Sequence, residues 1–223
     1  LISSRKQVDT LKLEALVKEL ELKTIKAHIN PHFIFNALNS IRALIDENPP
    51  RARTAITELS NILRSSMQAE KLETVTFEKE LNIVKDYLAL EHIRFEDRLQ
   101  VEYEIDEDTL DQPIPPMMLQ TLVENAIRHG IARQKEGGEV SIGARVEDRT
   151  MVLSVRNAGH YVKPRAPADG IGLRNSRQRL AHIYGNKARL EIRNDHGSVL
   201  CEVRLPYPAR EGVDNAYALN QDQ

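Results

Sequence analysis

Residues 115–130 read PPMMLQTLVENAIRHG, and they decide how the second half of the chain folds. Five apolar residues recur in this stretch at the spacing i, i+3, i+4, i+7, i+8: Leu119, Leu122, Val123, Ala126 and Ile127. That spacing puts them on one side of an α-helix. A polar stripe follows the same spacing on the opposite side: Thr121, Glu124, Asn125, Arg128 and His129. The stretch therefore predicts an amphipathic helix that packs its apolar side on another layer.

The polar stripe is compatible with a solvated helix face or with a ligand site. The amide oxygen of Asn125 and the carboxylate of Glu124 can hold a hard cation. One turn later, Arg128 can meet a phosphate group. This mixture of side chains favours the ligand site.

Two glycine-containing turns follow this predicted helix. Asn157-Ala158-Gly159 comes after a predicted strand, and Gly170-Ile171-Gly172 opens a predicted helix. Glycine lets the backbone approach a ligand closely, and a helix N-terminus presents free N–H groups to phosphate. A single such turn is most often an ordinary turn. Their order, after a helix with a polar stripe, favours a nucleotide site.

Alternation of apolar residues at period two predicts strands through the second half of the chain. The alternating runs are 101–105, 140–146, 151–155, 190–192 and 199–205. Helical stretches at 117–130 and 172–184 lie between them. Strands of this kind form a largely antiparallel sheet with one covered face. Helices on that face give a two-layer α/β sandwich, an α+β fold.

The first half is predicted to be helical. Apolar residues recur every seven positions from Leu13 to Ile41, the seam of a coiled coil or bundle. Pro49-Pro50 ends this helix, and a second amphipathic helix at about 52–67 makes an antiparallel hairpin with it. Because a lone hairpin leaves apolar surface exposed, we expect two copies to pair as a dimeric four-helix bundle. Thr76 is the expected cap of a third helix.

These patterns divide the chain into three parts. A helical region spans 1–97, a sheet-bearing domain spans 98–208, and a polar tail spans 209–223. We expect the tail to be disordered.

Composition limits the function. The chain has 31 Lys+Arg against 33 Asp+Glu, and the resulting net charge of −2 argues against a nucleic-acid binder. The single cysteine, Cys201, favours a reducing compartment, and the alternation around it predicts a buried core thiol. No apolar run approaches the roughly 20 residues of a membrane span. Because the chain starts at Leu1, we expect a cytoplasmic piece whose membrane anchor, if any, lies upstream.

Four stretches resemble the LytS-type branch of sensor histidine kinases, whose ATP-binding domain belongs to the GHKL group with the Bergerat fold. They are KAHINPHFIFNALNSI (26–41), DYLALEHIRFEDRL (86–99), PPMMLQTLVENAIRHG (115–130) and GIGLRNSRQRL (170–180). The resemblance implies a homodimer that uses Mg²⁺ and ATP to phosphorylate its own histidine. It also implies onward transfer to an aspartate on the receiver domain of a response regulator.

Carried over to this sequence, the resemblance makes Asn125 the Mg²⁺ ligand, with Glu124 as a helper. Arg128 and His129 would lie near the phosphates, and Asn157 stands where the wider group has an aspartate that accepts a hydrogen bond from adenine. Gly159, Gly170 and Gly172 would bound the lid over ATP, and Leu173 would be a further nucleotide-binding residue. Three positions depart from the family pattern: Ala168, Asp169 and Thr121.

The phosphoacceptor implied by the resemblance is His32, inside NPHFIFN. The heptad count independently puts His32 at position f, farthest from the seam, so its nucleophilic imidazole should be exposed. Asn36, one turn later, can hydrogen-bond the ring and fix its tautomer. Pro31 is expected to bend the helix, because it removes a backbone N–H. His28, one turn earlier, is the rival acceptor.

Two other functions remain open from the sequence. The altered lid at Ala168-Asp169, together with Asn157, suits a non-enzymatic module that senses a nucleotide by changing shape. A GHKL ATPase without phosphohistidine is the third possibility, and the NPHFIFN segment counts against it.

Overall fold

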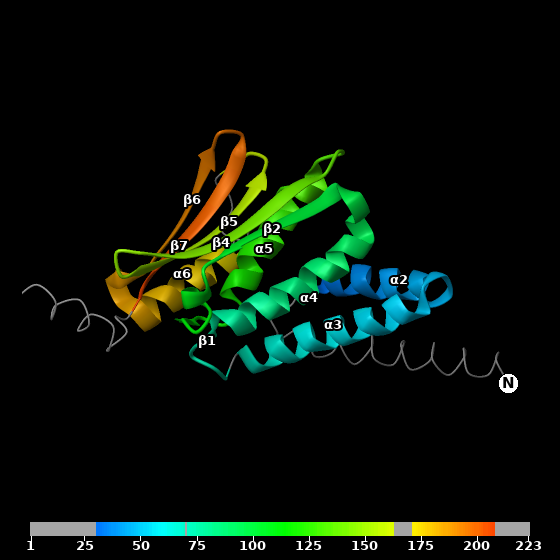
Figure 1. Ribbon diagram of the computed structural model, residues 1–223, viewed down its shortest axis with the longest axis horizontal. Helices are drawn as coiled ribbons and strands as arrows, with labels where there is room; N and C mark the ends of the chain where they lie inside the picture. Colours follow the sequence, from blue (N-terminus) through cyan, green and yellow to red (C-terminus); the bar gives the residue numbers. More distant parts are fainter. Residues whose placement is uncertain (1–29, 70, 163–170, 208–223) are drawn as a thin grey trace, which may run out of the picture. The chain divides into compact units, whose positions relative to one another are not determined.

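The computed structural model describes residues 30–69, 71–162 and 171–207, which fall into two compact units (Figure 1). One unit comprises the residues up to Glu73 together with Asn82–Glu96. The other comprises Thr74–Leu81 and the residues from Asp97 onward. The predicted seam before residue 30 and the predicted tail at 209–223 lie outside the described residues. None of the helices in the described ranges is both long and apolar enough for a membrane span.

Helix α2 (Pro31–Glu47) begins where the sequence predicted a bend within a longer helix. Its N-cap, Asn30, has an extended backbone, and its side-chain oxygen accepts a hydrogen bond from the His32 backbone N–H at 3.1 Å. Proline disfavours helical backbone in the residue before it, and at the first helical position it leaves no N–H unpaired. Pro31 therefore starts a helix after a non-helical Asn30, and the predicted bend within a longer helix involves residues before Asn30, which lie outside the described residues.

Helix α3 (Pro49–Ala69) follows after one residue, Asn48, whose N–H donates to the Leu44 carbonyl at 2.8 Å. The predicted helix end at Pro49-Pro50 is confirmed. The two helices form a hairpin (Figure 1). Its buried apolar residues are Phe33, Ile34, Ala37, Leu38 and Ile41 from α2, and Ala52, Ala55, Leu59, Ile62 and Ala69 from α3.

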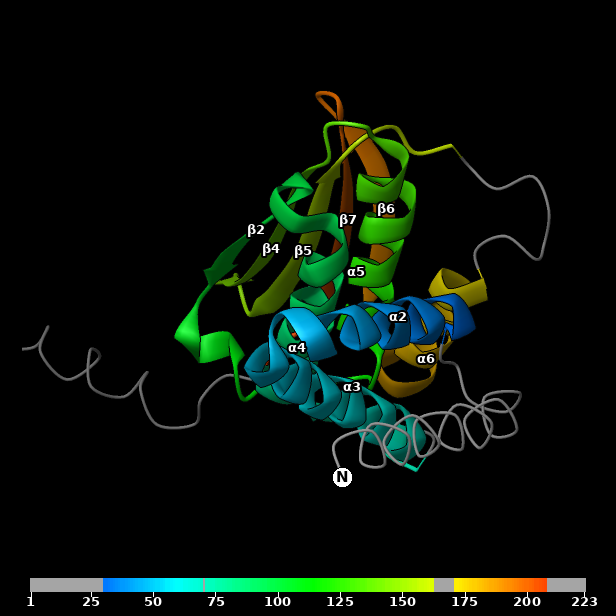
Figure 2. The same cartoon turned by 90° about the vertical axis from the view of Figure 1, so that its right-hand side faces the viewer.

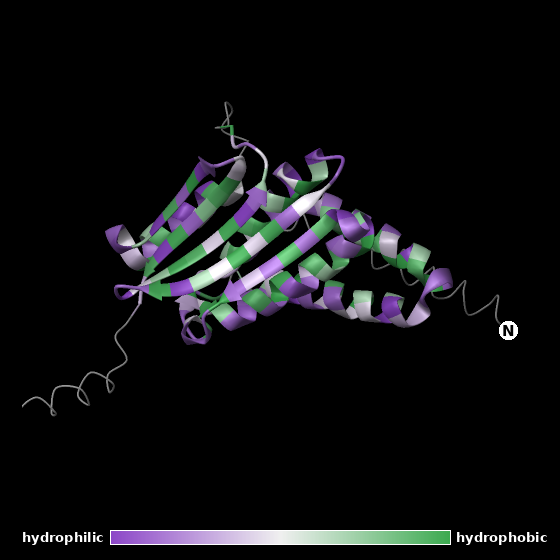
Figure 3. Ribbon diagram, turned by 45° about the horizontal axis from the view of Figure 1, so that its top comes forward, coloured by the Kyte–Doolittle hydropathy of each residue, from purple (hydrophilic) through white to green (hydrophobic). Residues whose placement is uncertain are grey.

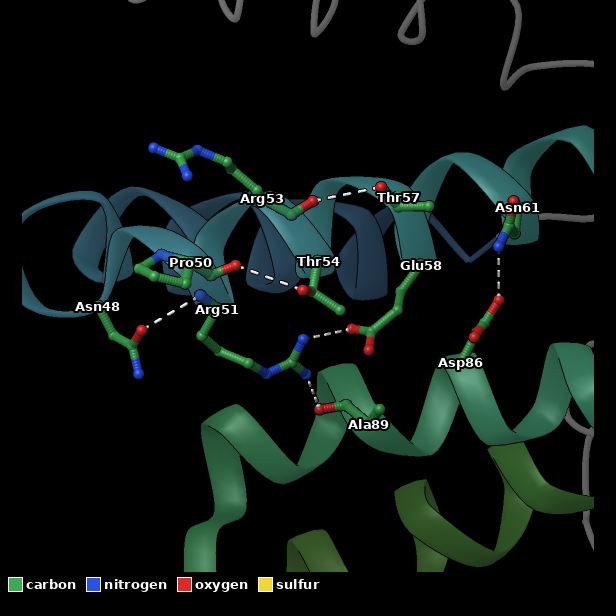
Figure 4. A network of polar contacts seen from close by, with 10 residues as sticks. All are labelled: Asn48, Pro50, Arg51, Arg53, Thr54, Thr57, Glu58, Asn61, Asp86 and Ala89. Atoms are coloured by element: carbon green, nitrogen blue, oxygen red, sulfur yellow. Dashed lines mark hydrogen bonds and ion pairs between the residues drawn. The ribbon is translucent and has the colours of Figure 1, made fainter.

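The later part of helix α4 (Phe77–Phe95) belongs to the same unit as this hairpin. Figure 4 shows the polar contacts that hold α4 on α3. The Arg51 guanidinium donates to the Glu58 carboxylate at 2.8 Å and to the Ala89 carbonyl at 3.0 Å. Nearby, the Asn61 amide donates to the Asp86 carboxylate at 2.9 Å. The hairpin is thus fastened to a third helix of its own chain.

An aromatic contact adds to this packing. The ring of Phe33, on α2, lies 4.7 Å from the ring of Tyr87, on α4, centroid to centroid. The hairpin nevertheless keeps large apolar side chains exposed: Phe35, Ile45, Ile56 and Met67. Pairing of the hairpin with a second copy stays a prediction. Because α4 already covers part of the hairpin, a second copy would cover less apolar surface than it would on a bare hairpin.

The second unit begins with a short strand, β1 (Val75–Thr76), which pairs antiparallel with β3 (Pro113–Ile114). The Thr76 hydroxyl accepts a hydrogen bond from the Lys79 N–H at 3.4 Å, so the predicted cap of α4 is confirmed. Backbone hydrogen bonds from Phe77 and Glu78 also hold the start of α4 within this unit.

A five-stranded sheet in the order β2-β4-β5-β7-β6 forms the rest of the second unit. Its strands are β2 (Leu99–Ile105), β4 (Gly138–Glu147), β5 (Thr150–Ala158), β6 (Arg189–Asp195) and β7 (Ser198–Pro206). Only the β2–β4 pair is parallel among these strands. Figure 3 shows hydrophobic and hydrophilic residues alternating along the strands. The largely antiparallel sheet is confirmed.

Helices α5 (Met118–His129) and α6 (Ile171–Tyr184) lie on the same face of this sheet (Figures 1 and 2). Short 3₁₀ turns connect the elements at Glu96–Arg98, Glu107–Thr109, Ile131–Arg133 and Gly185–Lys187. All five residues of the predicted apolar stripe on α5 are buried. The α+β fold with a two-layer sandwich is therefore as predicted.

Candidate functional site

A cavity of about 500 Å³ opens in the second unit between α5 and the sheet. The strand register helps to build its wall, because Val155 stands opposite Cys201 and Asn157 stands opposite Val199 on neighbouring strands. The lining residues are Leu122, Asn125, Ala126, Arg128, His129, Arg133, Val155, Asn157, His160, Tyr161, Val162, Leu173, Ile192, Val199 and Cys201. The cavity thus joins an apolar wall to a group of nitrogen-bearing side chains.

The position of Asn125 on α5 leaves its amide oxygen available to a ligand. Its Nδ2 donates to the Thr121 carbonyl at 2.8 Å, which fixes the amide orientation. Its Oδ1 lies 3.4 Å from the Arg128 guanidinium, at the limit of a hydrogen bond. The Arg128 Nε in turn donates to the His129 ring at 3.1 Å. An amide oxygen with two basic side chains next to it suits a hard cation bound to phosphate.

Glu124 does not line the cavity, although its neighbour Asn125 does. The Gln120 amide donates to the Glu124 carboxylate at 2.8 Å, on another side of the helix. The structure therefore brings Asn125, Arg128 and His129 together at the cavity and directs Glu124 elsewhere.

Asn157 lies buried in the cavity wall at the end of β5. Its Nδ2 donates to the Ala158 carbonyl at 2.8 Å, which leaves the amide oxygen as the free acceptor. This amide packs against Gly130, where a Cβ atom would come within 2.4 Å of Nδ2. Glycine is therefore required at the end of α5 to make room for Asn157. Gly159, which adopts φ 131°, donates its N–H to the Gly197 carbonyl at 3.2 Å.

The structure describes only the residues at the two ends of the predicted lid. Gly170, Ala168 and Asp169 lie outside the described residues. Leu173, in the first turn of α6, lines the cavity. Gly172 is exposed and lies beside α5, where a Cβ atom would come within 2.9 Å of the Thr121 methyl group.

Several lining residues were not foreseen from the sequence. Arg133 comes from the 3₁₀ turn after α5, and His160, Tyr161 and Val162 come from the segment after β5. Tyr161 is held there because its N–H donates to the Asn194 side chain at 2.7 Å. No periodic pattern covers these segments. The only signal for His160, Tyr161 and Val162 is that they follow the turn at Asn157-Ala158-Gly159, and Arg133 has only its place just after Gly130.

Cys201 is buried, as predicted for a core thiol. Its place in the wall of the cavity, opposite Val155, was not predicted. Burial raises the pKa of the Cys201 thiol to about 12. The thiol is therefore protonated and unreactive at neutral pH.

A buried carboxylate caps the N-terminus of α5. Met117 precedes the helix in a left-handed conformation, at φ 61°, and has no side chain that can cap it. The Glu80 carboxylate accepts the Met117 N–H at 2.8 Å from the first turn of α4. Burial raises the pKa of Glu80 from 4.5 to about 7, against the lowering effect of backbone N–H groups and Arg179.

This shift predicts how stability depends on pH. Because the pKa of Glu80 is higher in the folded chain, the folded chain binds more protons between pH 4.5 and 7. Stability is therefore lost as pH rises through this window, by roughly 3 kcal/mol. Glu80→Gln should remove this pH-dependent loss of stability, because glutamine does not ionise. The free energy of unfolding of the variant, relative to that of the wild type, should therefore increase from pH 5 to pH 8. Chemical denaturation followed by circular dichroism measures the difference.

The control is Glu78→Gln, an exposed acid in the same helical turn. It should leave the pH dependence unchanged. A difference between Glu80→Gln and wild type that does not change with pH would contradict the proposed ionisation.

In the first unit, His32 is exposed on the first turn of α2. The Asn36 Nδ2 lies 3.1 Å from the His32 Nδ1, so the hydrogen bond expected from their spacing is present. In this amide orientation Nδ1 accepts from the Asn36 Nδ2, whereas the reversed amide would accept from Nδ1–H, so the contact is compatible with either ring tautomer. The ring is thus oriented by its neighbour one turn along.

The histidine kinase family profile matches residues 20–99. Over 206 residues the chain is 36% identical to the sensor protein LytS of Staphylococcus saprophyticus, covering 86% of this chain and 35% of that protein. The chain belongs to the histidine kinase family. It is also 39% identical over 182 residues to the sensor histidine kinase YpdA of Escherichia coli, covering 78% of this chain and 32% of that protein.

The chain spans about a third of the length of these curated relatives. Among solved structures, the catalytic domain of histidine kinase ThkA aligns with a TM-score of 0.46 at 21% identity, over 60% of this chain and 96% of that chain. The roles of individual residues in this family member follow from its own geometry.

Proposed function

We propose that this chain is a histidine kinase that binds Mg²⁺ and ATP in the cavity of its second unit and phosphorylates His32. The observation that carries the proposal is the composition of the cavity wall. Apolar side chains such as Val155, Ile192 and Val199 suit a purine ring. The basic group, made of Arg128, His129, Arg133 and His160, suits a polyphosphate.

The donor set also fits a magnesium ion. Asn125 would hold it through Oδ1, since Nδ2 is occupied by the Thr121 carbonyl. Mg²⁺ commonly takes few protein ligands and completes its shell with water and substrate phosphates. When bound, the ion offsets the charge on the phosphate oxygens. Arg128 then orients the phosphate chain from one turn along the same helix.

The acceptor in this proposal is the exposed imidazole of His32. Its nitrogen forms a bond to the γ-phosphorus while the bond from that phosphorus to the bridging oxygen breaks, and ADP leaves with the electron pair. Attack through the outer nitrogen, Nε2, needs the ring proton on Nδ1. The Asn36 amide supports that tautomer after a 180° turn, because its oxygen then accepts from Nδ1–H.

Partners and location follow from the same proposal. The exposed apolar residues of the hairpin, such as Phe35 and Met67, suit pairing with a second copy. The phosphoramidate is energetic enough to pass its phosphoryl group to an aspartate on a response-regulator receiver domain. The chain would act in the cytoplasm as part of a sensor.

The experiment is incubation of the chain with Mg²⁺ and ATP labelled at either the γ- or the α-phosphate. The proposal expects acid-labile, base-stable label on the protein from γ-ATP and none from α-ATP. If the chain binds nucleotide but takes up no label from γ-ATP, the result would contradict the kinase proposal and favour the nucleotide-sensing module. Steady ATP turnover without labelled protein would indicate an ATPase.

Base selectivity gives a separate prediction. The free oxygen of Asn157 can accept from the amino group of adenine, whereas guanine presents a carbonyl oxygen at that position. ATP should therefore displace a fluorescent ADP analogue at concentrations roughly 10-fold lower than GTP. In Asn157→Leu this preference should disappear. Equal displacement by ATP and GTP in the wild type would show that Asn157 does not read the base.

A further inference from the structure

The segment that follows β5 is fastened to the hairpin of β6 and β7. Gly159 donates its N–H to the carbonyl of Gly197, in the turn of that hairpin, at 3.2 Å. The Asn194 side chain, on β6, accepts the Tyr161 N–H at 2.7 Å and donates to the Tyr161 carbonyl at 3.1 Å. Because both backbone groups of Tyr161 are engaged by one amide, its ring is the part that it can offer to the cavity that it lines.

The strand register puts Asn194 on the cavity face of the sheet. Val199 stands opposite Asn157 on β5 and opposite Asn194 on β6, and paired residues of antiparallel strands project to the same face. Asn157 and Val199 both line the cavity, as does Ile192, two residues before Asn194 on the same strand. The three paired residues therefore form one row across the end of the sheet, with Tyr161 attached at its β6 end.

The length of this row leaves room for one flat base. Neighbouring strands lie about 5 Å apart, so Asn157 and Asn194 are separated by roughly 10 Å. The free oxygen of Asn157 stands at one end, where the proposed function puts the amino group of adenine. Val199 supplies an apolar surface between the two ends. A base that Asn157 holds over Val199 therefore extends toward Tyr161.

We infer that the Tyr161 ring stacks on the base of the bound nucleotide, and that Asn194 is the positioning residue that holds the ring there. The inference rests on the proposed function, because it needs a nucleotide in the cavity. Every base has a π-face, so stacking adds affinity without distinguishing adenine from guanine. Tyr161 thus supplies affinity for any purine nucleotide, whereas Asn157 supplies the preference for adenine.

A plain loop contact is the alternative explanation of the Asn194 hydrogen bonds, since Asn194 is exposed. Hydrogen bonds that water can replace contribute little to stability. Their effect in this position is to orient Tyr161, whose side chain is half-buried at the cavity. The two explanations differ in what the loss of Asn194 changes, because only the stacking role links Asn194 to nucleotide affinity.

The test compares ligands with and without a base, by calorimetric titration with ADP, GDP and pyrophosphate. Tyr161→Ala should weaken the binding of ADP and GDP by the same factor, roughly 10-fold, and leave pyrophosphate binding unchanged. Tyr161→Phe keeps the ring and should bind ADP like the wild type. Asn157→Leu should give the opposite pattern, in which the ratio of ADP to GDP affinity changes.

Tyr161→Trp reports the stacking directly, because the chain itself contains no tryptophan. A base stacked on the indole quenches its fluorescence, so ADP should quench this variant and pyrophosphate should not. The control is Tyr103→Trp, since Tyr103 is an exposed tyrosine of β2 in the same unit and does not line the cavity. Its fluorescence should not respond to ADP.

Asn194→Leu tests the positioning role. It should weaken ADP binding several-fold with little change in melting temperature, because it removes two exposed hydrogen bonds. Combined with Tyr161→Ala, it should bind ADP no more weakly than Tyr161→Ala alone, because Asn194 acts through Tyr161. The matched control is Asn186→Leu, at an exposed asparagine in the turn before β6, which should keep the ADP affinity of the wild type.

The outcomes separate this inference from the proposed function. A wild type that binds no ADP would remove the proposed function itself. A wild type that binds ADP, together with an unchanged affinity in Tyr161→Ala or no quenching in Tyr161→Trp, would overturn this inference alone. So would a Tyr161→Ala variant that loses pyrophosphate affinity in parallel with ADP affinity, because a parallel loss indicates a structural role.

Discussion

His32→Gln is expected to reduce ATP-dependent, acid-labile phosphorylation by at least about 1,000-fold, because the nucleophile is removed. The substitution should not unfold the helix. The Asn30 cap is bonded to the backbone N–H of residue 32, and the side chain is exposed. Affinity for ADP should be unchanged, since the cavity lies in the other unit. Labelling with γ-ATP and ADP titration on the same preparation measure both quantities.

The control for this variant is His92→Gln, since His92 is an exposed histidine on α4. It should label like the wild type. His28→Gln tests the rival acceptor and should also label normally. Undiminished label in His32→Gln, or label lost only in His28→Gln, would contradict the assignment of the acceptor.

Asn125→Ala is expected to lower Mg²⁺-dependent phosphorylation by on the order of 100-fold, because the ion loses its side-chain ligand from α5. The loss should be largest at low Mg²⁺ and should shrink as the ion concentration rises. Binding of ADP without Mg²⁺ should weaken far less. The measurement is a magnesium titration of both the phosphorylation rate and the nucleotide affinity.

Asn61→Ala is the matched control for this substitution. Asn61 donates to Asp86 at 2.9 Å in the other unit, so its loss removes an amide without touching the cavity. It should leave the magnesium dependence unchanged. An Asn125→Ala variant with the magnesium dependence of the wild type would show that the ion is held by other groups.

The apolar side of α5 and the positions of the main strands along the chain could be predicted, because burial imposes a strict period on the sequence. The polar side was harder, since neighbouring residues of a helix point about 100° apart. Periodicity grouped Glu124 with Asn125 in one stripe. In the structure, this angle separates a residue at the cavity from one beside Gln120.

Other parts of the site depend on contacts between distant segments. Glu80 accepts a hydrogen bond from Met117, the N-cap residue of α5, which lies 37 residues later in the chain, and no local pattern in either segment indicates this contact. Arg133 and His160 reach the cavity through irregular backbone. By contrast, the start of α2 at Pro31 was readable from Asn30-Pro31, a capping residue followed by proline. The heptad pattern predicted one continuous helix through Pro31, so this helix-start signal was not used.

The central claim is that a phosphoryl group from ATP arrives on one particular imidazole. It is tested most directly by peptide mapping of the chain at neutral or alkaline pH after incubation with Mg²⁺ and ATP. The account predicts that the phosphorylated peptide contains His32, with one ADP formed for each group transferred. An unmodified His32 peptide in a preparation that has consumed ATP, or a phosphoryl group on another residue, would contradict it.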